Sequence, residues 1–276
     1  MRIKEVQNRL YDIMIIFDNI CRKNHISYWL HGGTAIGAVR EHDFIPWDDD
    51  VDILILAEDY PKLKSTMKKE LPQYLHLIEP IDFSPYFYDY IPKIIDDRFL
   101  LRTENNETLA LKNYNNHVCL DIFLLSHCPQ SRLQQKLWLL EYNILYGMAM
   151  GYRYSIDYRK YSFIQKCEVT FLRTLGKIFS GKTPERLFKL WESFVYSCAI
   201  PKTQTRMISN TTPNSYWHPM PDEWFKATVL KQFRDVNLPV EKDYDLILTQ
   251  AYGDYMIPTR DSQKYMTHLD SNDYTL

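Results

Sequence analysis

The chain has 276 residues, of which 45% are hydrophobic and 25% are charged, and its formal net charge is −2. This composition is that of an ordinary soluble globular protein, and the length allows one large domain or two small ones. The near-neutral balance argues for no particular partner, and we predict no nucleic-acid partner.

Cysteine usage and hydropathy indicate the compartment. The five cysteines are scattered and none forms a C-x-x-C pair, which suits a reducing compartment and argues against a disulfide framework or a thiolate zinc site. Residues 1–6 read as the start of an amphipathic helix without an apolar signal core. No stretch approaches the roughly 20 apolar residues that span a bilayer. We therefore expect a cytoplasmic protein.

Hydrophobic periodicity in the first half predicts alternating strands and helices. Its strongest strand is 50–56, where two acids lead into an apolar run. The elements expected in chain order are a helix over 3–24, a strand over 26–30, a tight turn at 31–33, a helix over about 35–40 capped by Thr34, the strand over 50–56, an amphipathic helix ending near Leu71, strand-like pieces at 74–79, 86–95 and 98–103, and a buried strand over 118–125.

The second half is predominantly helical and basic. From Arg132 to about Ser197 the pattern predicts three helices, separated near Gly151 and Gly181, with 11 Lys or Arg against five Asp or Glu. Short strands and one helix near 241–252 follow. We expect an α+β protein in three regions: a catalytic core over 1–130, a helical, basic and aromatic region over 131–200, and a C-terminal α+β part over 201–276 that completes the active-site cleft.

Asp50 and Asp52 are the main candidates for chemistry. Residues two apart in a strand project from the same face, so the two carboxylates lie side by side and repel each other. A divalent cation relieves this repulsion, and magnesium is commonly held by one or two carboxylates together with substrate phosphates. The pair therefore predicts metal-assisted phosphoryl transfer. The alternative is an exposed acidic turn, although the pair leads directly into an apolar strand.

Other acids extend this site. Asp48 and Asp49 precede the pair, and Asp48 is the better candidate because its side alternates with Asp50 and Asp52. Asp121 stands in the middle of the apolar strand over 118–125 and needs a cation beside it if buried. As a third carboxylate it would complete a two-metal site. The structural alternatives are a loop cap or an ion pair with Lys93 or Arg98.

A glycine turn precedes the carboxylates. Gly32 and Gly33 stand between a predicted strand and a predicted helix, where glycine lets the backbone approach a ligand closely. Free amides at the start of a helix favour anionic oxygens. Gly-Gly-Thr by itself is as often a tight turn as a phosphate cradle. Its significance as a candidate site comes from its place 16 residues before Asp50, in the order strand, turn, helix, strand.

Two longer runs resemble a known family. GGTAIGAVR at 32–40 and FIPWDDDVD at 44–52 are similar to the signature of the LicD family, which includes bacterial phosphorylcholine transferases and the catalytic domains of fukutin and fukutin-related protein. The resemblance continues at 121–123 and 252–255, with His268 following. It implies a nucleotidyltransferase-like fold of the polymerase-beta type, which is a mixed sheet with flanking helices, here joined to a helical second half.

The resemblance also implies a reaction. Family members transfer phosphocholine from CDP-choline to a sugar of a teichoic acid, lipooligosaccharide or capsule precursor and release CMP, and others transfer ribitol phosphate from CDP-ribitol. We therefore expect a metal-dependent phosphotransferase with a CDP-linked donor, CDP-choline being favoured, and a lipid-linked or polymeric glycan acceptor. The alternatives are transfer of ribitol or glycerol phosphate, NMP transfer from an NTP, and a non-catalytic sugar- or nucleotide-binding module.

Site roles follow from the same resemblance. We expect two Mg²⁺ ions, with Mn²⁺ as an alternative, held by Asp50, Asp52 and Asp121. The donor phosphates would be cradled by Gly32 and Gly33, with Thr34 nearby. Arg40 would either clamp phosphate or hold the metal carboxylates in place.

Three further expectations are more open. A choline cage would need aromatic faces, and an aromatic core is the alternative for each candidate: Tyr86, Tyr88, Tyr90, Trp217 and Trp224. His268 and Asp254 either contact the acceptor or secure the C-terminus. The basic region over 131–197 either lies peripherally on the anionic inner face of the membrane or is a solvated helical face, since its sequence shows no clean apolar outer stripe.

Overall fold

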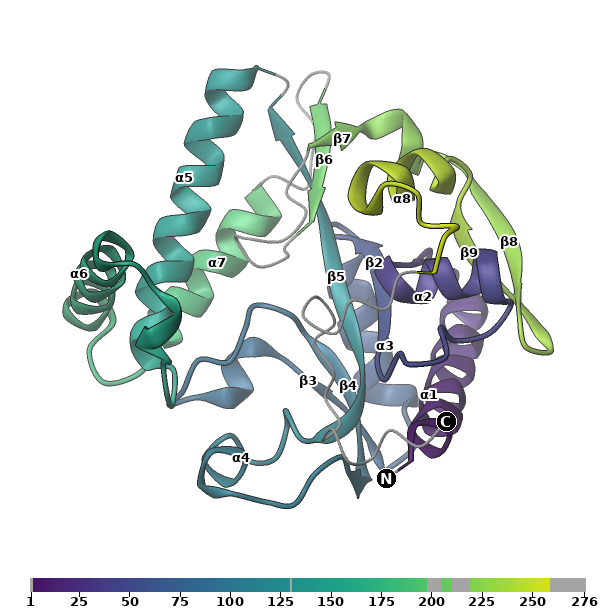
Figure 1. Cartoon of the computed structure of the whole chain (residues 1–276), viewed down its shortest axis with the longest axis horizontal. Coiled ribbons are helices and arrows are strands. Elements are labelled where there is room, and N and C mark those ends of the chain that lie inside the picture. The colour runs from purple at the N-terminus through teal and green to yellow at the C-terminus, as the bar shows by residue number, and fades with distance from the viewer. Residues whose placement is uncertain (1, 130, 198–204, 210–218, 259–276) are drawn as a thin grey trace.

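The computed structural model describes residues 2–129, 131–197, 205–209 and 219–258. Within these residues a mixed sheet has the strand order β1-β2-β5-β4-β3, and β6 and β7 continue it from β5 (Figure 1). β2 and β5 are parallel and the other neighbours are antiparallel. The strands are β1 (Trp29–Leu30), β2 (Val51–Leu56), β3 (Leu75–Ile78), β4 (Lys93–Leu100), β5 (His117–Pro129), β6 (Thr205–Ser209) and β7 (Met220–Pro221), and a separate hairpin joins β8 (Thr228–Phe233) to β9 (Val236–Glu241).

The helices lie around this sheet. The long N-terminal helix buries its apolar residues at helical spacing, and it begins with Glu5 in its first turn and ends with Arg22 and Lys23 in its last. A π-turn over Gly37–Glu41 follows the second helix. The α-helices are α1 (Ile3–Lys23), α2 (Gly32–Ile36), α3 (Tyr60–Glu70), α4 (Asn106–Ala110), α5 (Arg132–Ala149), α6 (Phe163–Ser180), α7 (Glu185–Ser197) and α8 (Tyr244–Tyr252).

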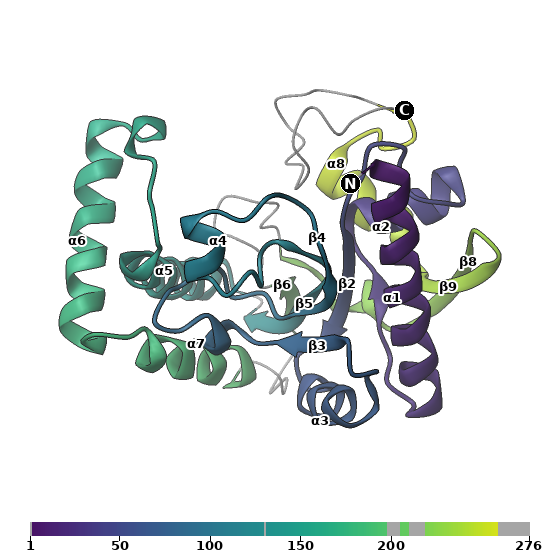
Figure 2. The ribbon, with the colours of Figure 1, turned by 90° about the horizontal axis from the view of Figure 1, so that it is seen from below.

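One cluster of buried apolar side chains runs through the molecule. It includes Phe17 of α1, Ile53 of β2 and Ile122 of β5, and it extends to Trp191 of α7. Helices α5 and α7 therefore share a core with the sheet, and α6 packs on α5. They form a lobe on the opposite side of the molecule from α1 (Figures 1 and 2).

Close contact between α5 and α6 depends on glycine. A Cβ built on Gly176 of α6 would lie 2.3 Å from the carbonyl oxygen of Met148 in α5. A Cβ on Gly147 of α5 would lie 2.4 Å from Leu172 of α6. The two helices can cross at this separation only because both positions lack a side chain.

Most predicted elements are confirmed, including the three helices after Arg132, but two expectations were wrong. The predicted strand over 86–95 begins only at Lys93 and continues to Leu100 as one strand. The segment before it leaves the sheet because Phe87 N donates instead to the carbonyl of Tyr152, and Pro92 has no amide for a ladder.

The predicted cap of the second helix was also wrong. The helix begins at Gly32 with His31 in the N-cap position, so Thr34 lies inside it. The Thr34 hydroxyl instead accepts a hydrogen bond from Asp52 N at 2.9 Å, across to the neighbouring strand. A tertiary contact has replaced the local one.

No helix in the described part of the chain is both long enough and apolar enough to cross a membrane.

Candidate active site

The sheet brings together two carboxylates that are far apart in the sequence. Asp52 on β2 pairs in register with Asp121 on the parallel strand β5. Their Cα atoms are therefore neighbours, and both side chains project from the same face of the sheet. This register places Asp121, the predicted third acid, beside the Asp-x-Asp strand.

The carboxylates form a cluster with strong mutual repulsion. Burial, followed by the charges of Asp50 and Asp121, raises the pKa of Asp52 well above its ordinary value. Burial and the neighbouring Asp50 raise the pKa of Asp48 in the same direction. Both pKa values rise for the same two reasons: the carboxyl groups are buried, and other negative groups lie beside them. The cluster therefore attracts positive charge.

Lys93 supplies one positive charge at this point. It pairs in register with Asp121 across β4 and β5, and its Nζ lies 3.0 Å from Asp121 Oδ1. The side chain of Lys93 is only 5% exposed, against 18% for Asp121. Burial by itself would lower the pKa of Lys93, but Asp121 together with the neighbouring Cys119 and Tyr88 outweighs this effect and raises the pKa well above its ordinary value. Lys93 is thus a permanent cation in the cluster.

The ion pair has further contacts on β4 and β5. Cys119 Sγ lies 3.5 Å from Asp121 Oδ1, as a donor to it, and 3.9 Å from Lys93 Nζ. The ring of Tyr88 faces the ammonium group, with 5.4 Å between Nζ and the ring centroid. These contacts fix both side chains at one end of the cluster. The structural alternative of an Asp121–Lys93 pair is therefore realised, beside the carboxylates of the proposed site.

The glycine turn lies directly against the carboxylates. A Cβ built on Gly33 would stand 2.7 Å from Asp48 Oδ2, and one on Gly32 would stand 3.2 Å from Asp52 Oδ2. Gly32 also has a φ of +55°, which disfavours any other residue. The turn and the carboxylates thus form one site, in which a side chain at Gly33 would collide with Asp48 and one at Gly32 would be crowded and strained.

The backbone of Asp52 is held from both sides by this turn. His31 N donates to Asp52 O at 2.9 Å, and Asp52 N donates to the Thr34 hydroxyl at 2.9 Å. Burial lowers the pKa of His31 to about 4, so its imidazole is neutral, and its ring contacts that of Phe123. These contacts give Thr34 a clear role in positioning Asp52.

Arg40 connects the π-turn to the C-terminal part of the chain. Its Nε lies 2.6 Å from Glu41 Oε1, and its Nη1 donates to the backbone carbonyl of Tyr255 at 2.5 Å. The Arg40 guanidinium therefore joins the segment after α8 to residues Gly37–Glu41. Contact between Arg40 and a donor phosphate stays a prediction.

The cluster fits a hard divalent cation in its chemistry. Its donors are carboxylate oxygens, which magnesium prefers, and the buried Oδ2 of Asp48 has no hydrogen-bond partner among the described residues. Within those same residues, however, no group of three or more His, Cys, Asp or Glu side chains is already arranged to hold a metal ion. The residue types fit the expected ion, and metal binding by Asp50, Asp52 and Asp121 stays a prediction.

The aromatic candidates separate into different environments. Tyr90 is buried and stacks on Trp191 at 4.9 Å, so it belongs to the core. Tyr86 contacts Tyr154, and Trp224 packs against a small apolar cluster around Trp29. Of the three tyrosines, Tyr88 is the one in contact with Lys93. The predicted alternating strand of tyrosines was wrong, because 86–92 is not a strand.

The C-terminal candidates are only partly described. Trp217 and His268 lie outside the described residues, and Asp254 is exposed. Tyr252, in the last turn of α8, places its hydroxyl 3.1 Å from the position of a Cβ on Gly32.

Two residues of the site are only weakly indicated by the sequence. Lys93 is expected as one possible ion-pair partner of Asp121, and its place beside the carboxylate cluster follows from the pairing of β4 with β5. Tyr252 was noted only as part of a resemblance. Its position over the glycine turn depends on packing between distant segments.

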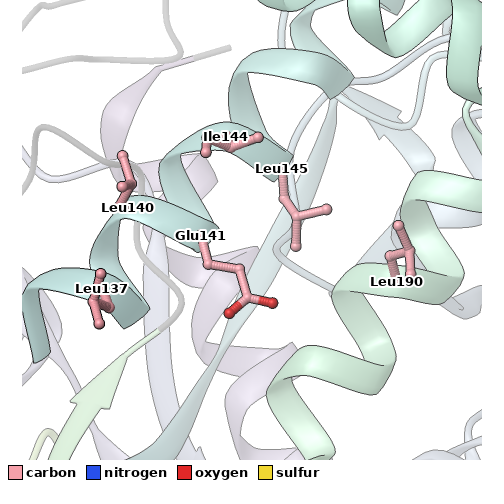
Figure 3. A pocket seen from close by; sticks show the side chains of 6 residues that line it. All are labelled: Leu137, Leu140, Glu141, Ile144, Leu145 and Leu190. Carbon is pink, nitrogen blue, oxygen red and sulfur yellow. The ribbon is translucent and has the colours of Figure 1, made fainter. Parts of the chain in front are cut away.

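A separate groove lies between α5 and α7 (Figure 3). It has a volume of about 300 Å³ and is lined by Leu137, Leu140, Glu141, Ile144, Leu145 and Leu190. It shares no residue with the carboxylate cluster and offers aliphatic groups with one carboxylate. The groove is therefore separate from the carboxylate cluster in both place and chemistry.

The fold and site define a mixed α/β protein with acids on neighbouring strands beside a glycine turn. Residues 25–89, which include the turn and Asp48 to Asp52, match the family model described as "LicD/FKTN/FKRP, nucleotidyltransferase domain". This match confirms the resemblance to the LicD family.

Individual relatives extend this result. The lipopolysaccharide cholinephosphotransferase LicD of Haemophilus influenzae is 27% identical over 274 residues, which cover 96% of this chain and 95% of that protein. Human ribitol 5-phosphate transferase FKRP is 56% identical over 34 residues, or 12% of this chain and 7% of that protein. An uncharacterised protein of Rickettsia prowazekii is 36% identical over 98 residues, or 36% of this chain and 35% of that protein. The chain is thus similar to a cholinephosphotransferase along almost its whole length and to a ribitol 5-phosphate transferase over a short segment.

Proposed function

We propose that this protein transfers phosphocholine from CDP-choline to a sugar hydroxyl of a cell-surface glycan precursor and releases CMP. The observation that carries the proposal is the in-register pairing of Asp52 and Asp121 beside the glycine turn. Similarity to the Haemophilus cholinephosphotransferase along almost the whole of both chains supports phosphocholine as the transferred group. A nucleotidyltransferase-like fold is part of the same proposal.

Asp50, Asp52 and Asp121 would hold magnesium in this site. When bound, the metal supplies positive charge that offsets both the carboxylates and the diphosphate of the donor. The raised pKa of Asp52 supports this assignment, since the cluster without a metal ion disfavours its own charged form even beside Lys93.

The remaining chemistry belongs to the chain's own residues. Gly32 and Gly33 leave room for phosphate oxygens to approach the backbone beside the carboxylates. The acceptor hydroxyl forms the new O–P bond in line while the P–O bond to CMP breaks and CMP leaves with the electron pair. Asp121 accepts the proton of the hydroxyl, and Lys93 holds Asp121 in position through the ion pair.

A second donor has support of its own. The match of 34 residues at 56% identity with a ribitol 5-phosphate transferase favours CDP-ribitol as the alternative donor. The same site would serve either donor, because the diphosphate and the cytidine are common to both.

Donor screening tests the proposal without knowledge of the acceptor. Thermal unfolding would be followed with CDP-choline, CDP-ribitol, CDP-glycerol and CTP, each with and without Mg²⁺. We expect the largest magnesium-dependent stabilisation with CDP-choline. Asp52→Asn should abolish it, and Asp97→Asn, an exposed acid on β4, should not.

Product analysis then distinguishes the reactions. Release of CMP in the presence of a glycan acceptor supports transfer of a phosphorylated group. Release of pyrophosphate from a nucleoside triphosphate would instead indicate NMP transfer. Stabilisation by all four nucleotides that is independent of Mg²⁺ would contradict the metal-dependent mechanism.

A further inference from the structure

Helix α6 directs its apolar side chains outward. Phe163 is 80% exposed, Ile164 77%, Phe171 67% and Ile178 77%. Ile164, Phe171 and Ile178 are spaced by seven residues, which is close to two helical turns, so they lie on one face of the helix. Together with Cys167 and Leu175, which are also exposed, they form what we call the α6 stripe.

The opposite face of α6 is the one that packs on the protein. Gly176 lies against Met148, and Leu172 lies against Gly147, both in α5. The stripe is therefore the solvent-facing side of α6, because the other side of the helix already packs on α5. The expectation that this region has no clean apolar outer stripe was wrong, because the pattern depends on which face of α6 packs against α5.

Basic residues accompany the stripe. Lys166 and Lys177 lie on one side of the stripe, beyond Thr170 and Thr174, and Glu168 borders its other side. Just beyond the end of α6, Lys182 and Arg186 are exposed, and Arg186 Nη1 donates to the carbonyl of Phe179. Residues 132–197 have an excess of six positive charges in a chain whose net charge is −2. Charge is thus concentrated where the apolar side chains are exposed.

We propose that α6 binds the surface of an anionic lipid bilayer, with its stripe among the lipid chains and its lysines at the headgroups. An amphipathic helix with large apolar residues on one face and Lys or Arg beside them lies in the plane of such an interface. No described helix can span a membrane, so surface attachment is the mode of contact that these residues offer. This inference goes beyond the proposed transfer reaction and does not depend on it.

The place of α6 in the molecule suits this contact. Both views show it at the outer edge, away from the sheet and from α1 (Figures 1 and 2). Residues of the carboxylate cluster lie on β2, β5 and the turn before them, and none lies on α6. Attachment through α6 would therefore leave the proposed site uncovered.

A second copy of the chain is the competing occupant of the stripe. Charge favours the bilayer, because the basic residues beside the stripe complement anionic headgroups, whereas a second copy would bring its own excess of positive charge. The test therefore includes the oligomeric state.

Vesicle flotation with the whole chain decides between these occupants. We expect the protein to float with vesicles of phosphatidylcholine and phosphatidylglycerol, and to remain largely unbound with phosphatidylcholine alone. High salt should weaken the binding, because the electrostatic part is screened. No donor nucleotide is needed, so loss of enzymatic activity and loss of membrane binding are measured separately.

Matched variants locate the contact. Phe171→Ser with Ile178→Ser should lower the affinity for anionic vesicles by about tenfold or more, whereas Leu109→Ser with Leu230→Ser, two similarly exposed residues elsewhere, should not. Lys166→Gln and Lys177→Gln should each weaken binding by about fivefold. Unchanged thermal unfolding of the serine variants would show that they are folded.

A probe on the stripe gives a second readout. Cys167 is exposed there, so in a Cys198→Ser background it can carry a polarity-sensitive fluorophore. A blue shift with anionic vesicles supports insertion of the stripe. The proposal is overturned if no anionic vesicle is bound, if the serine pair binds as well as the original chain, or if that pair converts a dimer to a monomer while vesicle binding is absent.

Discussion

Asp52 and Asp121 pair in register on the parallel strands β2 and β5, and Lys93 pairs in register with Asp121 on β4. Three charged residues thus form a row across three neighbouring strands. A slip of one residue in either pairing would turn one of them to the other face of the sheet. The register of the sheet is therefore a requirement of the proposed site, and the following predictions test what each member contributes.

Replacement of Asp52 by Asn should separate stability from activity. The variant removes a negative charge from a cluster in which that charge is disfavoured, so in the absence of metal its unfolding midpoint should rise by about 2–4 °C. Transfer should fall on the order of 10³-fold. Calorimetry with EDTA and an assay of CMP release measure the two effects, and near-normal turnover would refute the role of Asp52.

Magnesium should stabilise the original chain and not this variant. Binding to the folded state alone raises the unfolding temperature by mass action. We expect a Mg²⁺-dependent increase for the chain with Asp52 and almost none for Asp52→Asn, with EDTA reversing the first. An equal response from both proteins would place the metal elsewhere.

Removal of Lys93 should destabilise the fold through Asp121. Lys93→Met leaves a half-buried carboxylate without its cation, at a cost of about 3 kcal/mol in the free energy of unfolding. Lys93→Met with Asp121→Asn should recover most of this loss, because the charge that needs compensation is gone. Urea unfolding of the four proteins in this double-mutant cycle gives the coupling energy. Additive effects would mean that the ion pair contributes little.

A methyl group on the glycine turn should disturb the carboxylates. In Gly33→Ala the new Cβ would stand 2.7 Å from Asp48 Oδ2, so that side chain must move. Transfer should fall by about 10- to 100-fold, because small displacements of groups that position substrate are costly. If the effect is steric, Gly33→Ala combined with Asp48→Ala should be no worse than Asp48→Ala alone. A further loss in the double variant would show a separate role for Gly33.

Glu241 should make the protein less stable at alkaline pH. Burial raises the pKa of this carboxyl to about 8 from an ordinary value of 4.5, and its Oε1 has no hydrogen-bond partner within the described residues. The folded state therefore binds more protons than the unfolded state between these values. The resulting stability is fully present below about pH 4.5 and is lost as the pH rises through about 8.

Glu241→Gln should remove this dependence. At pH 8.5 the variant should be more stable than the original chain, by an amount on the order of a few kcal/mol, and at pH 4.5 the two should be similar. Chemical unfolding at both pH values measures the difference, with the exposed Glu223→Gln as the control. Equal stability at pH 8.5 would show that Glu241 is not held neutral in the fold.

Local patterns predicted much of the fold. The apolar spacing of α1 and the apolar runs of β2 and β5 depend on neighbours in the sequence, so helices and strands could be assigned from them. Where a distant contact competes with a local preference, prediction failed. The Thr34 hydroxyl accepts a hydrogen bond from Asp52 N and does not cap the helix. The tyrosines at 86–90 do not form a strand, and Tyr90 among them stacks on Trp191 in the core.

The sequence by itself determined the acids of the site and their relation to the glycine turn, because these residues are close neighbours whose spacing is a local property of strand and turn. It also carried the LicD resemblance, which rests on the same segment. Only the tertiary structure decided that Asp121 stands beside Asp52, that Lys93 pairs with Asp121, and that α6 faces outward with its apolar side. These relations depend on strand register and helix packing between distant segments, which no local spacing specifies.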